Sequence, residues 1–117
     1  MKLHMRCALA LLFLQALVAC SSKTEAPSPQ IFSGVYSTDG FEYSNFYPSE
    51  SKEAWTTKGA LMWSVIPLGK FPMRCGSATV TVRGVISPPG KYGHLDCCSR
   101  ELNVQEILQV RDAKACA

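Results

Sequence analysis

The chain has 117 residues, a formal net charge of +3 and six cysteines, and 47% of its residues are apolar. This length suffices for one small domain and excludes doubly wound nucleotide-binding folds and (β/α)8 barrels, which need far more chain. Lys2 and Arg6 lie in a leading segment in which 15 of 19 residues are apolar, and the remainder has ten basic and nine acidic side chains. A nearly neutral remainder gives no indication of a nucleic-acid partner.

The first 19 residues have the layout of a secretory signal peptide. A cationic start, residues 1–6, precedes sixteen uncharged residues from Cys7 to Ser22. Signal peptides combine a positive start, an apolar middle and a small residue before the cleavage site. The alternative is a permanent membrane span, which needs about 20 apolar residues; this run is shorter and contains Gln15. We therefore predict that residues 1–19 direct export.

The segment ends in Leu17-Val18-Ala19-Cys20, which resembles the lipobox of bacterial lipoproteins. The resemblance implies that the Cys20 thiol receives a diacylglyceryl group, that cleavage falls between Ala19 and Cys20, and that the new amino group is acylated, typically with palmitate. The alternative is an ordinary signal peptide whose cleavage site precedes a cysteine. Two or more acyl chains hold a protein stably on a membrane. In lipoproteins of this kind, an Asp directly after the lipidated cysteine favours retention at the inner membrane. Here that residue is Ser21, so the same resemblance implies an outer-membrane anchor that faces the periplasm.

Residues 20–30 predict a flexible tether. After Cys20 the segment is made of Ser, Thr, Pro, Gln and charged residues, with Ala26 as its one apolar side chain. Such a segment cannot bury enough apolar surface to offset its ordering entropy, and when extended it reaches at most roughly 35 Å. The chain thus divides into a signal peptide (1–19), a lipidated cysteine with its tether (20–30) and a small β domain (31–117).

The first part of the domain predicts three strands. Residues 31–36 and 41–47 flank the turn sequence Ser-Thr-Asp-Gly and predict a hairpin. The polar residues 49–57 are compatible with a helical turn before Trp55. Residues 60–66, with the sequence ALMWSVI before Pro67, predict the third strand.

The second part predicts two more strands. In residues 77–87 Val and Thr alternate, and Gly84 predicts a bulge or bend. Residues 100–110 fit a strand or a helical face, and the neighbouring β elements favour the strand. The fold class predicted is mainly β: a small antiparallel sheet or a partly open OB-like barrel.

Four cysteines remain once Cys7 is removed with the signal and Cys20 carries lipid: Cys75, Cys97, Cys98 and Cys116. An even number in an oxidising compartment predicts disulfides. A bond between the neighbours 97 and 98 is not expected, because Cα atoms about 3.8 Å apart fall below the usual range of about 4.4–6.8 Å. Two pairings stay open: 75–97 with 98–116, or 75–98 with 97–116.

A metal- or thiol-responsive site is the alternative use of these cysteines. His94, Asp96, Cys97 and Cys98 lie within five residues, and Cys75 or Cys116 could complete a set of four ligands. However, Cys-x-x-Cys spacing is absent and the mature chain has one histidine. Disulfides are therefore the preferred interpretation, and His94, Cys97 and Cys98 the alternative metal set.

No catalytic motif emerges from the sequence. Residues 84–91 superficially resemble a phosphate-binding loop, but the glycine spacing is one residue too long and no Ser or Thr follows Lys91. A Gly-x-Ser-x-Gly nucleophile motif is also absent, and the acidic residues are scattered. We therefore predict no catalytic residue, no cofactor and a non-enzymatic domain.

Ten of the eleven aromatic residues lie between Phe32 and Tyr92. Filling of the core of a small β domain is the simpler interpretation. The alternative is an exposed aromatic face that binds an envelope protein, a glycan or a peptidoglycan strand.

Tyr92-Gly93-His94-Leu95 and the alternating residues 100–111 resemble the carboxyl-terminal part of small bacterial envelope lipoproteins of unassigned activity. This resemblance covers about twenty residues and implies a compact domain; the adjacent Cys97 and Cys98 depart from it. The function expected is a lipid-anchored, non-enzymatic binding or structural domain.

Overall fold

The computed structural model describes residues 27–59, 61–69 and 74–117. Its elements are β1 (Gln30–Thr38), β2 (Ser44–Pro48), β3 (Trp55–Lys58), η2 (Leu61–Val65), β4 (Gly76–Ile86), η3 (His94–Asp96) and β5 (Arg100–Ala115). The predicted signal peptide, Cys20 and most of the predicted tether lie outside the described residues. In the described part of the chain, no helix has the length and apolar character needed to cross a membrane.

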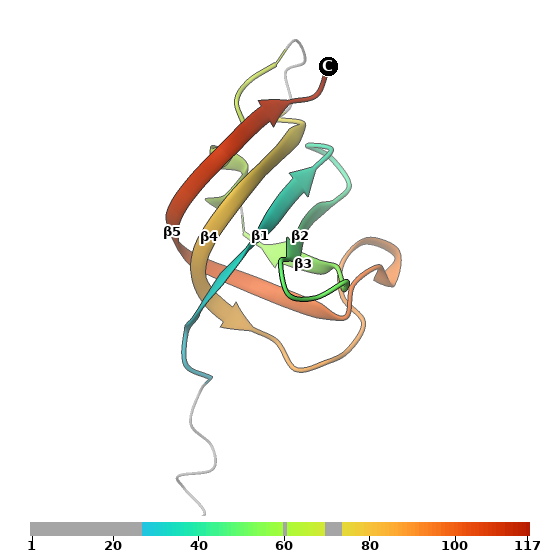
Figure 1. The fold of residues 1–117 in the computed structure, drawn as a ribbon. Helices are drawn as coiled ribbons and strands as arrows, with labels where there is room; N and C mark the ends of the chain where they lie inside the picture. The colour runs from blue at the N-terminus through green and yellow to red at the C-terminus, as the bar shows by residue number, and fades with distance from the viewer. Residues whose placement is uncertain (1–26, 60, 70–73) are drawn as a thin grey trace, which may run out of the picture.

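The five strands form one mixed sheet that closes in a ring in the order β1-β2-β3-β5-β4 (Figure 1). The mainly β prediction is confirmed. The prediction of an all-antiparallel sheet is wrong, because β3 and β5 pair in parallel while the other four pairings are antiparallel. The reason is geometric: five is an odd number, so strands in a closed ring of five cannot alternate direction at every contact.

The predicted first hairpin is confirmed, with β1 pairing antiparallel to β2. Asp39 holds the turn between them: its Oδ1 accepts hydrogen bonds of 2.8–3.0 Å from the backbone N–H groups of Phe41, Glu42 and Tyr43. Slight desolvation raises the pKa of the Asp39 carboxyl, but these donors outweigh it and the net pKa is lowered.

The predicted strand at 60–66 is wrong. The third strand is Trp55–Lys58, and Leu61–Val65 is a 3-10 helix. Met62 and Ile66 are fully buried while Trp63 is 42% exposed. Ser64, which a strand would place on the same face as Met62 and Ile66, is exposed, so the segment lacks the alternation of a strand. The apolar run therefore packs as a helical segment against the sheet.

Both later strands are confirmed. β5 is a strand over Arg100–Ala115, which settles the ambiguity of residues 100–110. The β4–β5 register shifts between Arg83 and Gly84, as predicted for a bulge. A Cβ at Gly84 would lie 2.5 Å from the Asn103 carbonyl oxygen, so only glycine allows the strands to approach there.

The core fills the interior of the ring with side chains from all five strands and η2: Tyr36, Phe46, Trp55, Met62, Ile66, Ala78, Val80, Val82, Leu102 and Val104. The core-filling interpretation thus holds for Tyr36, Phe46 and Trp55, whereas Phe41 is 77% exposed. The Tyr36 hydroxyl lies 2.6 Å from Ser44 Oγ, which lies 2.6 Å from Thr57 Oγ1. Burial raises the pKa of Tyr36, so it stays a neutral hydrogen-bonding group.

Both open cysteine pairings are wrong. Cys75 pairs with Cys116, their Cα atoms 5.3 Å apart. The register of β4 and β5 explains this pairing. Gly76 lies opposite Ala115, so their chain neighbours Cys75 and Cys116 are brought together at the end of the two strands.

The second disulfide joins the neighbours Cys97 and Cys98, whose Cα atoms lie 3.7 Å apart. The short Cα separation of neighbouring residues predicts no bond here, and that prediction is wrong. In the fold, Cys75 and Cys116 are already paired at the far end of β5, so these two cysteines are left with each other beside η3.

Candidate functional site

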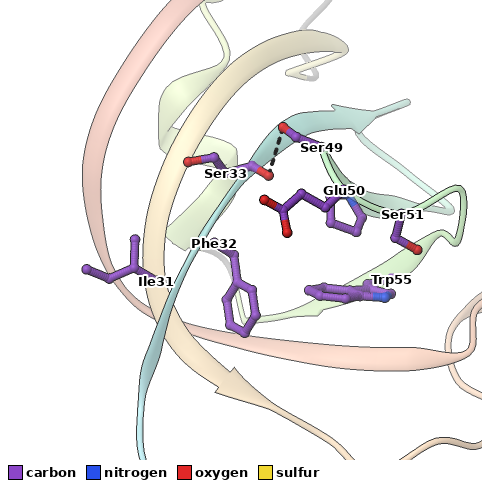
Figure 2. A pocket seen from close by; sticks show the side chains of 8 residues that line it. Ile31, Phe32, Ser33, Ser49, Glu50, Ser51 and Trp55 are labelled. Carbon is purple, nitrogen blue, oxygen red and sulfur yellow. Dashed lines mark hydrogen bonds between the residues drawn. The ribbon is translucent and has the colours of Figure 1, made fainter.

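A cavity of about 410 Å³ lies at the end of the ring where β1 begins (Figure 2). It is formed by the start of β1, the segment that joins β2 to β3, and the first residue of β3. The side chains that line it are those of Ile31, Phe32, Ser33, Pro48, Ser49, Glu50, Ser51 and Trp55.

Two aromatic rings form the apolar side of this cavity. Phe32 and Trp55 meet edge to face, with ring centroids 5.2 Å apart and an interplanar angle of 89°. Phe46 supports Trp55 from within the core at a centroid distance of 5.8 Å. Because Trp55 is only 8% exposed, the core fixes its ring and the cavity has a preformed aromatic side.

The polar side is a short turn fastened to β1. Pro48 ends β2, and the backbone N–H and the hydroxyl of Ser49 both donate to the Ser33 carbonyl oxygen, at 2.9 and 3.1 Å. Ser51 N–H donates to the Pro48 carbonyl oxygen at 3.2 Å. These bonds hold Glu50 at the rim, and Figure 2 shows its carboxylate between Ser33, Phe32 and Trp55.

Glu50 is the one ionisable side chain among the described residues that line the cavity. Over residues 27–59, 61–69 and 74–117, the salt bridges are Arg83–Glu106 and His94–Glu42, so no described cation neutralises Glu50. The cavity therefore has negative character.

Trp55 adds a hydrogen-bond donor to the same region. Its Nε1 is buried, and the described residues offer it no acceptor. A buried donor without a partner costs about 1–3 kcal/mol. In Figure 2 the indole nitrogen is on the side of the ring away from Phe32. Because almost none of the surface of this nitrogen is accessible, the N–H is enclosed by the protein and does not face the cavity.

The residues predicted as the alternative metal set lie elsewhere, around η3. Cys97 and Cys98 are bonded to each other, and their sulfur atoms lie 4.0 and 3.7 Å from Asn45 Oδ1 on β2. His94 Nε2 lies 3.7 Å from a Glu42 carboxylate oxygen. In the part of the chain that the structure describes, no three His, Cys, Asp or Glu side chains gather in a way that could hold a metal ion.

The sequence did not single out the cavity residues as a site. Phe32 and Trp55 were assigned to core filling together with the other aromatics. The available signal was the run from Ser49 to Glu53, rich in hydroxyl and carboxylate groups, between a proline that ends a strand and a tryptophan. This run lines a cavity only because Phe32 packs against Trp55, and the closure of the ring of strands brings these two residues together.

Comparisons of the chain with protein-family models, with curated proteins and with solved structures gave no significant match. The function is therefore argued from the residues of the cavity and from the sequence of the leading segment.

Proposed function

We propose that this chain is a lipid-anchored protein of the bacterial envelope whose β domain binds a small ligand in the Phe32–Trp55 cavity without transforming it. The anchor is Cys20, acylated after cleavage behind Ala19, and the protein faces the periplasm from the outer membrane. The cationic start, the uncharged run and the lipobox-like tetrapeptide support this part.

The cavity carries the binding part of the proposal. Small-molecule sites are concave and mostly apolar, with a few convergent polar groups, and typically measure about 300–1,000 Å³. Two aromatic rings, one carboxylate and three serine residues fit this description. The described lining contains no His, Cys or Lys to act with Glu50 as an acid–base or nucleophile pair, which favours binding over catalysis.

We also propose that the ring of five strands is a partly open OB-like barrel. The strand order and the parallel β3–β5 pairing support it. OB folds bind oligonucleotides and oligosaccharides on the face of strands 2 and 3. On β2 of this chain Asn45 is only 8% exposed and lies against Cys97 and Cys98. The end cavity is therefore the better binding site.

Thiol response through Cys97 and Cys98 is a second candidate function, favoured by their bond to each other in the loop between β4 and β5. Opening the bond would free two thiols against Asn45 on β2. Mass spectrometry after alkylation tests this candidate: mild reduction should label positions 97 and 98 before 75 and 116. Labelling of all four cysteines together would contradict it.

The anchor is tested by metabolic labelling with radioactive palmitate. Cys20→Ser should abolish the label and leave unprocessed precursor, whereas Cys7→Ser should be labelled and cleaved like the wild type. Normal maturation of Cys20→Ser would contradict the anchor.

The cavity is tested by photo-crosslinking in intact cells with a benzophenone amino acid at Ser51, on the rim, or at Gln109, on exposed β5. A small-ligand adduct is expected at Ser51 and not at Gln109, and it should disappear in Phe32→Ala. Equal adducts at both positions would contradict a site in this cavity.

A further inference from the structure

The charge of the cavity restricts what it can hold. The carboxyl group of Glu50 faces the cavity beside two rings (Figure 2). An anionic ligand would meet this carboxylate with no described cation in the lining to compensate. A neutral ligand would leave the carboxylate without a counter-charge. A cation is the complementary ligand.

The aromatic pair defines the kind of cation. Phe32 and Trp55 present ring surface next to Glu50, and an ammonium group within about 6 Å of a ring centroid is attracted to the π face. A hard metal ion such as Ca²⁺ would need several oxygen ligands, but the lining offers one carboxylate next to the phenyl ring of Phe32 and the indole ring of Trp55. The lining therefore suits an organic ammonium with apolar substituents.

We propose that the cavity recognises an alkylammonium group, such as that of an amino alcohol. This inference rests on the proposed function, because it specifies the ligand of the same cavity. Glu50 pairs with the ammonium, and Phe32 and Trp55 cover its alkyl groups.

The position of the cavity gives this chemistry two sources. Ile31 lies only eleven positions after Cys20, a distance of at most roughly 40 Å along an extended chain. Phospholipid head groups at the surface of the anchoring membrane are therefore within reach, and free amino alcohols in the periplasm are the other source.

Isothermal titration of the detergent-solubilised full-length protein tests the inference. The probes are choline and 3,3-dimethylbutan-1-ol, which has the same shape without the charge. We expect saturable choline binding and at least about tenfold weaker binding of the neutral probe, because the cation–π and carboxylate contacts are lost. Glu50→Gln should weaken choline binding by a similar factor, while Glu53→Gln, which makes the same charge change outside the lining, should leave it unchanged.

Equal affinities for the two probes, abolished by Phe32→Ala, would overturn the ammonium inference and leave the binding function standing. No choline binding would also overturn it, and the crosslinking at Ser51 then decides the proposed function separately. Glycerophosphocholine distinguishes the sources: tighter binding than choline assigns the cavity to lipid head groups, and weaker binding assigns it to free amino alcohols.

Discussion

The two disulfides should contribute very unequally to stability. Cys75 and Cys116 are 41 residues apart in the sequence, and a cross-link over a loop of that length removes unfolded-state entropy equivalent to about 4 kcal/mol. Cys97 and Cys98 are adjacent and close no loop, so their bond removes almost none. Replacement of Cys75 and Cys116 by Ala should therefore cost about 4 kcal/mol, a quarter or more of the roughly 5–15 kcal/mol that is the total stability of a typical domain.

Thermal unfolding followed by circular dichroism measures the difference. At about 4–8 °C per kcal/mol, the Cys75→Ala/Cys116→Ala variant should unfold roughly 15–30 °C below the wild type. The control, Cys97→Ala/Cys98→Ala, should lose about 1 kcal/mol from the buried Cys98 side chain. Equal losses in the two variants would refute the connectivity and the reasoning from loop length.

Three further outcomes are expected. Gly34→Ala should lose about 2 kcal/mol of unfolding free energy, because its Cβ would lie 2.2 Å from the Tyr47 carbonyl oxygen; Gly59→Ala, with φ +84° and open space around it, should lose about 1 kcal/mol. Asp39→Asn should be less stable than the wild type near pH 7, because the folded-state pKa of the Asp39 carboxyl is lowered below the ordinary 3.8 and the ionised carboxylate stabilises the fold. The difference in stability should vanish as the pH falls through that lowered pKa. A pH-independent difference in urea denaturation would contradict this. Trp55→Phe should remove the unpartnered indole N–H and change stability by less than Phe46→Ala, which should cost about 3–5 kcal/mol in the same denaturation assay.

The elements with a regular local pattern were predictable from the sequence. The alternation in residues 77–87 and the turn at Asp39 and Gly40 correspond to β4 and to the β1–β2 hairpin. The run 60–66 was misassigned because a short apolar segment fits a strand and a helical turn equally well. Exposure of Ser64 between the buried Met62 and Ile66 excludes the alternation of a strand, and it is the packing of these two side chains inside the ring, a tertiary contact, that selects the helical turn.

The disulfides and the cavity depend on contacts that span the chain. The Cys75–Cys116 pair follows from the β4–β5 register, which shifts at three places along the strands and which cysteine spacing alone does not reveal. The Phe32–Trp55 pair exists because ring closure brings the start of β1 to the start of β3. Residue types indicated an envelope domain that binds something, but only the closed ring shows which aromatic residues share a site with Glu50.

The indole N–H signals of the protein test the central claim most directly. Trp55 lines the cavity, whereas Trp63 lies on η2 and outside the lining, so a ¹H–¹⁵N correlation spectrum reports on the site and on an internal control in one titration with choline. We predict a saturable shift of the Trp55 signal with the Trp63 signal unmoved, and no shift in Glu50→Gln. Unmoved signals, or a Trp63 shift as large as that of Trp55, would contradict ligand binding in this cavity.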